Sequence, residues 1–413
     1  MLEKIGVNAK AASAELSGLT TSKKNEALLK MASSLEASSE KILRANRIDA
    51  EAARQRGLRP ALLDRLALDE KKIKGMAKCL REVADLPDPI GTIISTTIRP
   101  NGLQIGQLRV PLGVVGVIYE SRPDVTSDAS GICLKSGNAV ILRGGSDAIN
   151  SNLAIVEAFH SALDEACVTP DAIQIIESTE RSLAEEFMQM RDYVDVLIPR
   201  GGADLIQTVV HKSLIPVIET GTGNCHIFVE EDADLEKAIP IIVNAKCQRP
   251  GTCNAAEKLL ISEKIAERFL PRAANALKER GVEIRGDELV ARLVPGVKLA
   301  TEEDWYTEYL DLIMGVKVVK SLDEAISHIN KYGSKHSDSI LTRDYEKAMH
   351  FIKNVDSAAV YWNASTRFTD GNQFGLGAEI GVSTQKMHAR GPMSVQHLTS
   401  TKYFILGTGQ IRE

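Results

Sequence analysis

The chain has 413 residues, of which 44% are hydrophobic and 25% are charged, and its formal net charge is −5 at pH 7. This composition is ordinary for a soluble globular enzyme of two or three domains. The charges are scattered, so no basic stripe favours a nucleic-acid partner, and no apolar run of about 18 residues favours a membrane span. The N-terminus has no apolar signal core.

The cysteines and histidines limit the kinds of site that we expect. The six cysteines are widely spaced and form no CxxC pair, in a chain long enough to bury a large core, which favours a reduced, cytoplasmic setting. The eight histidines show no HxxxH or similar spacing, so we expect no structural metal.

The first part of the chain, up to about residue 88, has the pattern of amphipathic helices. Leu28, Met31 and Leu35 recur at helical spacing, and Thr20 and Ser22 offer N-caps. A coiled coil is the weaker alternative because no heptad persists. The Pro-Asp-Pro run at residues 87–89 then interrupts the helical pattern.

Residues 91–110 predict a β-hairpin, because two strand-like runs flank Asn101-Gly102, a strong tight-turn signal. Such a hairpin would expose an edge, which proteins usually cover. We hypothesise that it pairs with another subunit. A sheet formed within one chain is an equally good alternative.

From residue 114 the pattern changes to short apolar strands that alternate with helices, and we expect strands at 114–119, 139–143, 172–177, 194–198 and 215–218. This alternation predicts a parallel sheet covered on both faces, with ligands beyond the carboxyl ends of its strands.

Two glycine-rich turns lie at such strand ends and suggest a dinucleotide site, including one that accepts an extra phosphate on the adenosine ribose. Glycine lets a phosphate approach the backbone, a following helix offers N–H groups, and arginine adds charge. The candidate residues are Arg143, Gly144 and Gly145 in the first turn and Arg200, Gly201 and Gly202 in the second. There is no GxGxxG motif, and tight strand–helix turns are the alternative explanation.

A second alternating series starts near residue 226 and runs to 362, which places a domain boundary near 229. It contains the loop 248–254, which lies between a helical pattern and a strand and carries Cys253. Pro250 and Gly251 force a turn there. We interpret Cys253 as a nucleophile, whose thiolate would be favoured by Arg249 and the loop N–H groups. The alternative is an ordinary buried cysteine that packs as a small hydrophobe.

The last informative stretch, residues 363–392, is glycine-rich, polar and irregular, as functional loops often are. His388 lies in this stretch and is a candidate base. A surface or hydrogen-bonding role is the more common one for a lone histidine.

With these pieces placed, the chain resembles the aldehyde dehydrogenase superfamily, and most closely the γ-glutamyl phosphate reductases (glutamate-5-semialdehyde dehydrogenases) of proline biosynthesis. The resemblance covers nearly the whole chain. It rests on the Cys253 loop and on residues 109–114, 119–123, 134–145, 198–202, 363–370 and 373–392.

This resemblance implies a two-domain aldehyde dehydrogenase-like α/β fold. Residues 1–90 and 111–228 would form an NADP(H)-binding domain with an open parallel sheet and an N-terminal helical layer. Residues 229–390 would form an α/β catalytic domain that holds Cys253 across a cleft from the cofactor. The hairpin 91–110 and the C-terminal strand in 391–413 would form a small oligomerisation β-arm, which implies a homodimer or homotetramer.

The implied reaction is the NADPH-dependent reduction of L-glutamate 5-phosphate to the semialdehyde and phosphate through a thioester on Cys253, with the Cys253 N–H as an oxyanion donor. Glu308 resembles the superfamily glutamate that holds the nicotinamide ribose. An upstream glutamate 5-kinase is a possible partner, because acyl phosphates hydrolyse readily.

Arg122 departs from the superfamily pattern, since it stands where many oxidising relatives have an asparagine oxyanion donor. An arginine suits an anionic substrate, and we expect Arg122, Arg249, Asn254 and Arg367 to bind the substrate.

Glu219 aligns with the glutamate base of hydrolytic relatives, so it is a possible base and favours the main alternative, a hydrolytic NAD(P)-dependent aldehyde dehydrogenase. Arg122 and the C-terminal motifs oppose that alternative. Two further alternatives are a cysteine hydrolase or acyltransferase without a nucleotide, and a non-catalytic scaffold protein that keeps the fold.

Overall fold

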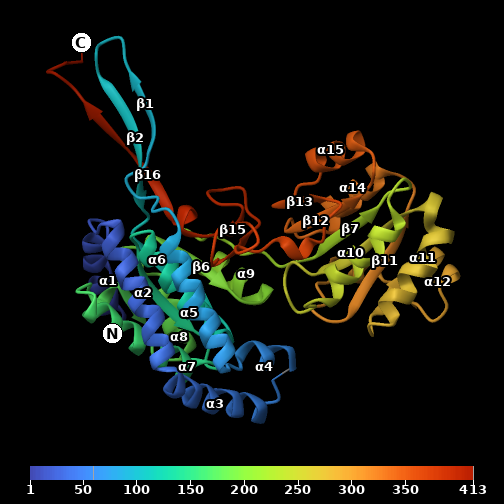
Figure 1. Cartoon of the computed structure of the whole chain (residues 1–413), viewed down its shortest axis with the longest axis horizontal. Coiled ribbons are helices and arrows are strands. Elements are labelled where there is room, and N and C mark those ends of the chain that lie inside the picture. The colour runs from blue at the N-terminus through green and yellow to red at the C-terminus, as the bar shows by residue number, and fades with distance from the viewer. Residues whose placement is uncertain (59, 413) are drawn as a thin grey trace. The chain divides into compact units, whose positions relative to one another are not determined.

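The computed structural model describes residues 1–58 and 60–412 and divides into two compact units (Figure 1). The first unit contains Met1–Glu219, Gly375–Gly381 and the chain from Met393 onward. The second contains Thr220–Phe374 and Val382–Pro392. The chain therefore passes from the first unit to the second ahead of the boundary expected near residue 229.

The first unit begins with the expected layer of amphipathic helices. Leu28, Met31 and Leu35 are completely buried, as their spacing predicted. The side chain of Thr20 accepts a hydrogen bond from an amide in the first turn of α2 (Thr21–Ala37), the N-cap interaction that starts many helices. These helices are α1 (Leu2–Leu16), α2 (Thr21–Ala37), α3 (Ser39–Gln55), α4 (Pro60–Leu66) and α5 (Glu70–Asp85).

A four-stranded parallel sheet forms the centre of the first unit, in the order β5-β4-β3-β6. Every residue of its central strand β3 is buried, which explains the continuous apolar run in the sequence. The strands are β3 (Val114–Tyr119), β4 (Ala139–Gly144), β5 (Ile173–Ile175) and β6 (Val196–Arg200). The helices that follow α5 in this unit are α6 (Pro123–Lys135), α7 (Ile149–Glu165), η1 (Pro170–Ala172), α8 (Arg181–Phe187), α9 (Ala203–Lys212) and η3 (Val395–Leu398).

The prediction of a fifth strand at residues 215–218 is wrong. Val217 forms only an isolated parallel bridge with Leu197. Two hydrogen bonds support that bridge, from Leu197 N to the Pro216 carbonyl and from Ile218 N to the Leu197 carbonyl. Pro216 has no N–H to continue the ladder, so the pairing stops after one residue.

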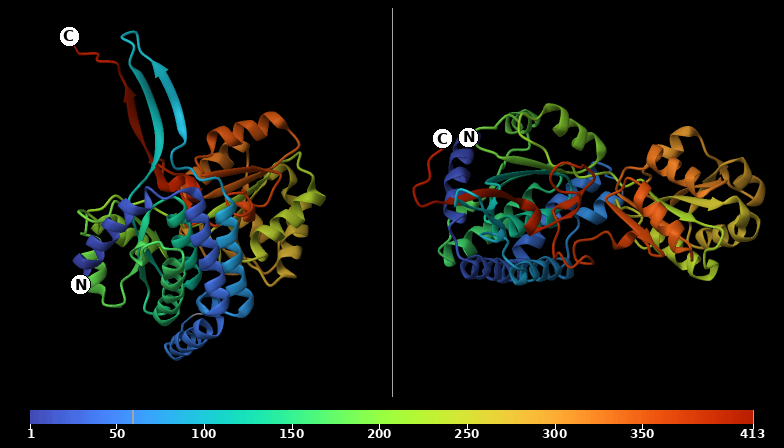
Figure 2. Two further views of the ribbon diagram at one scale, coloured as in Figure 1. Left: turned by 60° about the vertical axis from the view of Figure 1, so that its left-hand side comes forward. Right: turned by 90° about the horizontal axis from the view of Figure 1, so that it is seen from above.

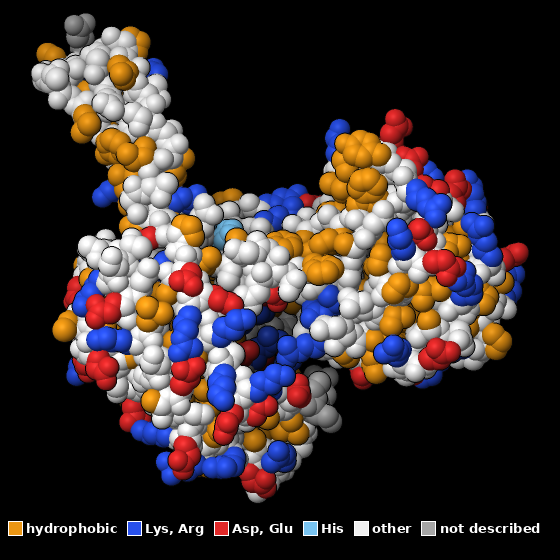
Figure 3. All heavy atoms as spheres, in the orientation of Figure 1, with side chains coloured by type: hydrophobic (Ala, Val, Ile, Leu, Met, Phe, Trp, Pro, Cys, Tyr) orange, Lys and Arg blue, Asp and Glu red, His pale blue; other side chains and the backbone are white. Residues whose placement is uncertain are grey.

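The predicted hairpin is confirmed as β1 (Ile93–Ile98) and β2 (Gln104–Pro111), but its partner lies in the same chain. Strand β16 (Thr399–Leu406) pairs antiparallel with β2 and gives a three-stranded arm in the order β1-β2-β16 (Figure 2). The alternative of an intrachain sheet is therefore the one observed for β2. Apolar side chains remain exposed along the arm, among them Ile98 at 73% and Tyr403 at 66% (Figure 3).

The second unit is built on a seven-stranded, entirely parallel sheet in the order β10-β9-β11-β8-β7-β12-β13. Its strands are β7 (Cys225–Val229), β8 (Ala256–Ser262), β9 (Glu283–Gly286), β10 (Lys298–Leu299), β11 (Ile313–Val319), β12 (Ser337–Leu341) and β13 (Ala359–Trp362). Its helices are α10 (Leu235–Cys247), α11 (Glu263–Lys278), α12 (Glu288–Leu293), α13 (Glu302–Tyr306), α14 (Leu322–Tyr332), α15 (Tyr345–Asn354) and η2 (Thr366–Phe368).

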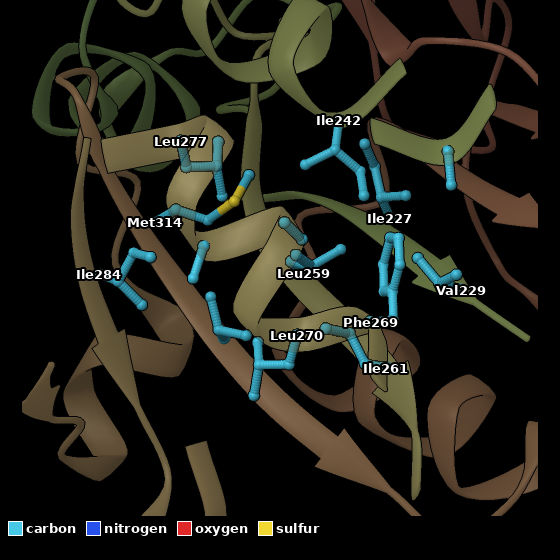
Figure 4. Packing of buried hydrophobic residues seen from close by; sticks show 14 of the residues in the cluster. Ile227, Val229, Ile242, Leu259, Ile261, Phe269, Leu270, Leu277, Ile284 and Met314 are labelled. Carbon is cyan, nitrogen blue, oxygen red and sulfur yellow. The ribbon is translucent and has the colours of Figure 1, made fainter. Parts of the chain in front are cut away.

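A large apolar cluster packs α10 and α11 against one face of this sheet. Phe269 and Leu270 of α11 lie against Leu259 and Ile261 of β8, and all four side chains are at most 1% exposed (Figure 4). This cluster fixes β8, and with it the end of the loop that carries Cys253. The α/β fold with parallel sheets that the sequence predicted is confirmed.

The C-terminal segment also forms a short two-stranded sheet of β14 (Gly381–Ser383) and β15 (Gly391–Met393). No helix within residues 1–58 and 60–412 is long and apolar enough to span a membrane. Across those same residues, the histidine, cysteine, aspartate and glutamate side chains form no cluster of three or more that would hold a metal ion.

Candidate active site

Cys253 lies in the loop that joins the end of α10 to the start of β8, and its side chain is half-buried. The turn expected at Pro250-Gly251 is present. The amide of Ala255 donates to the Thr252 carbonyl at 3.0 Å, which closes a tight turn around the cysteine. A thiol in this position is held by local backbone structure and does not belong to the apolar cores of the unit.

The backbone of Cys253 packs against Gly223 and Cys225, in the segment that leads into β7 and at its start. A Cβ placed on Gly223 would lie 1.4 Å from the Cys253 carbonyl oxygen, so only glycine fits there. The Cys225 thiol donates to the same oxygen at 3.1 Å. The amide of Gly223 in turn donates to the Glu308 Oε1 atom at 2.6 Å. Glu308, expected at the nicotinamide ribose, is therefore linked to the cysteine loop through one glycine.

Arg367 and Asn254 form a polar cradle beside the thiol. The Arg367 Nε atom donates to the Gln248 side chain at 2.8 Å, and its Nη1 atom donates to the Asn254 Oδ1 atom. The Asn254 Nδ2 group donates to the Thr369 carbonyl at 2.9 Å. The Thr252 hydroxyl completes the cradle and lies 3.0 Å from the Asn254 Oδ1 atom. The Asn254 amide thus holds the loop and the η2 segment together.

The surroundings of the Cys253 loop shift the pKa values of Arg367 and of the Cys225 thiol. Burial lowers the pKa of Arg367, with Arg249 acting in the same sense and Cys253 in the opposite sense, which places this guanidinium within electrostatic reach of the Cys253 sulfur. Burial raises the pKa of the Cys225 thiol well above its ordinary value, and Asp338 and Cys253 add to that shift. Cys225 therefore stays a protonated hydrogen-bond donor.

A chain of buried hydroxyl groups continues the site away from Cys225. The Cys225 Sγ atom lies 3.9 Å from the His336 Nδ1 atom, which lies 2.8 Å from the Ser337 hydroxyl. Ser337 and Thr369 share a hydrogen bond at 2.6 Å, and the Tyr361 hydroxyl lies 2.7 Å from Thr369. Burial raises the pKa of Tyr361 to about 12. The sequence did not predict this series of hydrogen bonds, because Cys225 is far in the sequence from His336, Tyr361 and Thr369.

In the first unit, the turn after β6 is contacted by the carboxylate of Glu120, which directly follows β3. The Glu120 Oε2 atom accepts a hydrogen bond from the Gly202 amide at 3.0 Å. A Cβ on Gly201 would lie 2.4 Å from the same oxygen. Arg200 lies 3.8 Å from the Glu379 carboxylate. The sequence suggested that the amides at the N-terminus of α9 bind a phosphate. The Gly202 amide instead donates its hydrogen bond to Glu120.

The residues of the turn after β4 also have partners within the first unit. Arg143 donates to the Thr179 and Glu180 carbonyls at 3.2 and 3.4 Å. Burial and the nearby Arg181 both lower the pKa of Arg143. A Cβ on Gly144 would lie 2.2 Å from the Asn152 side chain, so this glycine serves packing, whereas one on Gly145 would make only ordinary contacts.

At the start of α7, where the sequence suggested N–H groups for a phosphate, two of the amides already donate to a carboxylate. Asp49 accepts a hydrogen bond from the Ser151 amide at 2.8 Å and another from the Asn150 amide at 3.3 Å. Sequence reasoning missed Asp49 and Glu120 because each reaches its helix from a distant part of the chain.

The remaining predicted residues occupy separate positions. Arg122 is the half-buried N-cap residue of α6, and Glu219 is the half-buried last residue of that stretch of the first unit. Arg249 is exposed, and its carbonyl accepts from the Thr252 hydroxyl at 2.9 Å. His388 is exposed and has a positive φ of 66° in a loop tied to Asp356 by Lys386 and Arg390.

Comparison with known proteins gives a consistent result. The chain matches the model of the aldehyde dehydrogenase family over residues 2–290. It is 61% identical over 404 residues to a gamma-glutamyl phosphate reductase of Carboxydothermus hydrogenoformans, covering 98% of this chain and 97% of that protein. It is 60% identical over 407 residues to one of Clostridium perfringens, covering 98% of each.

Among solved structures, the crystal structure of gamma-glutamyl phosphate reductase from Thermotoga maritima superposes with a TM-score of 0.96 at 53% sequence identity, over 100% of both chains. The resemblance inferred from the sequence motifs is therefore confirmed. The chain belongs to the aldehyde dehydrogenase family and, within it, to the gamma-glutamyl phosphate reductases, which are oxidoreductases.

Proposed function

We propose that the chain catalyses the NADPH-dependent reduction of L-glutamate 5-phosphate to L-glutamate 5-semialdehyde and phosphate, the reductive step of proline biosynthesis, with Cys253 as the nucleophile. The observation that carries the proposal is the Cys253 loop. Its thiol is half-buried, its carbonyl accepts a hydrogen bond from the Cys225 thiol, and the Arg367 guanidinium is bound to the adjacent Asn254 side chain. Relatives that share about 60% of its residues bear the name of this activity.

The chemistry follows from the properties of an acyl phosphate, which is a good acyl donor. The Cys253 thiolate attacks the acyl carbon, phosphate leaves, and a thioester remains on the sulfur. When bound, a reduced nicotinamide would supply the hydride that reduces the thioester carbon. The resulting thiohemiacetal collapses to the aldehyde and returns the thiolate. The Cys253 amide is our candidate for an oxyanion donor in both tetrahedral states.

Cationic side chains near Cys253 suit an anionic substrate. Arg367 is fixed by Gln248 and Asn254, and Arg249 is close enough to lower the pKa of Arg367. Two cations beside one another repel, and a bound phosphate or carboxylate would relieve that repulsion. We assign Arg249 and Arg367 to substrate anions, with Asn254 holding Arg367 in place. Arg122 is assigned to the substrate by resemblance alone.

An NAD(P) cofactor goes with membership of the aldehyde dehydrogenase family. For the preference for NADPH we point to Arg143, which is half-buried with an Nε atom that has no hydrogen-bond partner and which lies near the exposed Arg181. This pair suits a ribose phosphate. We assign Glu308 to the nicotinamide ribose.

The test of this proposal is the substitution Cys253→Ala, with Cys167→Ser as the matched control. Cys167 is exposed and lies in the first unit. Cys253→Ala should abolish turnover while the binding of NADPH, followed by its fluorescence, survives, and Cys167→Ser should change neither. Substantial reductase activity in Cys253→Ala would contradict the assignment of the nucleophile.

We further propose that the arm joins subunits in a homodimer or homotetramer. Its exposed apolar side chains include Ile93, Ile98, Tyr403, Ile405 and Leu406, and such patches usually mark interfaces. The double substitution Tyr403→Asp and Ile405→Asp should lower the mass measured by light scattering. An unchanged oligomer would place the interface elsewhere.

A further inference from the structure

The strand that follows the Cys253 loop contains an irregularity at Glu257. In the pairing of β7 with β8, Cys225 lies opposite Ala256 and His226 lies opposite Lys258, so Glu257 is an extra residue on β8. Such β-bulges re-aim side chains and occur often beside active sites. Glu257 and Lys258 are both completely buried, although both are charged residue types.

The carboxylate of Glu257 contacts two other segments. Its Oε2 atom lies 2.9 Å from the Lys246 Nζ atom, and both side chains are 0% exposed. Its Oε1 atom accepts a hydrogen bond from the Leu310 amide at 3.3 Å. Lys246 lies near the end of α10, just before the Cys253 loop, and Glu257 lies just after that loop. The ion pair therefore ties the two ends of the loop together.

The segment that contains Leu310 is held in an uncommon conformation. Leu310 has a positive φ of 55°, a backbone conformation that residues with large side chains rarely adopt. The neighbouring Lys258 donates to the Thr307 carbonyl at 2.8 Å and lies 4.6 Å from the centre of the Tyr309 ring. Two successive residues of β8 thus fix both sides of Glu308.

Glu308 completes a closed circuit. Glu308 accepts a hydrogen bond from the Gly223 amide at 2.6 Å, and the Gly223 backbone lies directly against the Cys253 carbonyl. The circuit runs from Cys253 along β8 to Glu257, across to Leu310 and Glu308, and back through Gly223. The nucleophile and the proposed cofactor ligand are thereby set at a fixed spacing within the second unit.

We propose that Glu257 is a positioning residue that fixes the Cys253 loop against the segment carrying Glu308. It touches neither substrate nor cofactor, and it acts through Lys246 and the Leu310 amide. This inference rests on the proposed roles of Cys253 and Glu308. Both contacts have the same origin, because every residue of β8 is buried and a charged side chain in the interior needs partners.

The test is Glu257→Asp, whose carboxylate is shorter by one methylene and cannot keep both contacts. At a temperature where circular dichroism shows the variant folded, kcat should fall by roughly tenfold to a hundredfold, because a misplacement on the order of 1 Å has that cost. The KM for NADPH should rise, since Glu308 loses its support. The alkylation rate of Cys253 by iodoacetamide, measured by peptide mass, should change at least threefold.

The matched control is Asp88→Glu, which changes by one methylene a comparably buried ion pair in the first unit. Lys24 and Asp88 lie 2.9 Å apart with side chains 1% and 8% exposed. This control should lose thermal stability and keep the wild-type kcat, KM and alkylation rate. Loss of stability alone in Glu257→Asp, with these three values unchanged, would overturn the proposal.

A second variant covers the case in which Glu257→Asp does not fold. The pair Lys246→Met and Glu257→Gln removes both charges and leaves an amide oxygen for the Leu310 N–H. It should show the same direction of change in kcat and in the alkylation rate, and wild-type values would again overturn the proposal. The alkylation assay needs no turnover, so it reports on the loop even if activity in Cys253→Ala were to contradict the proposed nucleophile.

Discussion

Gly223 offers the sharpest test of how the nucleophile is supported. It has no catalytic group, and its backbone lies beneath the Cys253 carbonyl. An added Cβ would lie 1.4 Å from the Cys253 oxygen, 2.2 Å from its carbonyl carbon and 2.5 Å from its Cα. All three atoms are backbone, so no side-chain rotation can make room. The substitution Gly223→Ala must therefore displace the Cys253 backbone, the Gly223 backbone, or both.

The size of the displacement sets the expected loss. Ordinary van der Waals contact begins near 3.4 Å, so the atoms must separate by about 2 Å. A misplacement of reacting groups by about 1 Å can cost about a hundredfold in rate. We therefore expect kcat/KM to fall at least about a hundredfold, which corresponds to about 3 kcal/mol of transition-state stabilisation.

The assay is oxidation of NADPH with L-glutamate 5-phosphate as substrate, together with a thermal melt of each protein. The control is Gly75→Ala, because Gly75 lies exposed within α5 and its added Cβ would meet no atom within 4 Å beyond its chain neighbours and the nearby backbone of the helix. This control should keep full activity and gain about 0.5–1 kcal/mol of stability. Activity of Gly223→Ala within threefold of wild type would refute the reasoning.

Three further predictions concern the cofactor, the buried charges and the core. Arg143→Ala should raise the KM for NADPH more than that for NADH if its charge meets a ribose phosphate, and equal changes for both cofactors would remove that role. Burial lowers the pKa of Lys258 from 10.5 to about 7. Between these values the unfolded chain binds more protons than the folded one, so stability should rise with pH. Relative to Lys258→Met, the wild type should gain up to about 2 kcal/mol of unfolding free energy between about pH 7.5 and 9 in urea titrations, and parallel curves would argue against the shift. Phe269→Ala should cost about 3–5 kcal/mol of unfolding free energy, because Phe269 is 0% exposed in the cluster against β8, and a loss below about 1 kcal/mol would contradict that packing.

The features that the sequence predicted well are those set by neighbouring residues. Alternating apolar strands and helices, the Asn101-Gly102 hairpin and the Pro250-Gly251 turn all depend on local propensity, and the structure contains each of them. The strand at 215–218 failed for an equally local reason, since Pro216 cannot donate to a ladder. The short elements β9 and β10 were missed because four and two residues give too little periodicity to detect.

The features that the sequence could not predict are contacts between distant segments. Glu120 and Asp49 reach the helix N-termini where phosphates were expected, and nothing in the local sequence marks them as caps. Gly223 lies in a Gly-Thr-Gly run, but its contact with Cys253 depends on the packing of the cysteine loop against the segment before β7. Glu257 carried no signal at all, because its role follows from a bulge in the pairing of two strands.

The most direct measurement of the central claim runs the reaction in reverse. Purified protein is mixed with L-glutamate 5-semialdehyde and NADP, with and without inorganic phosphate, and the absorbance of NADPH is followed. We predict that NADPH forms at a rate that depends on phosphate, because phosphate releases the acyl group from Cys253. NADPH formation at an equal rate without phosphate would mean that water accepts the acyl group, which would contradict the account and point to Glu219 as the base of a hydrolytic aldehyde dehydrogenase.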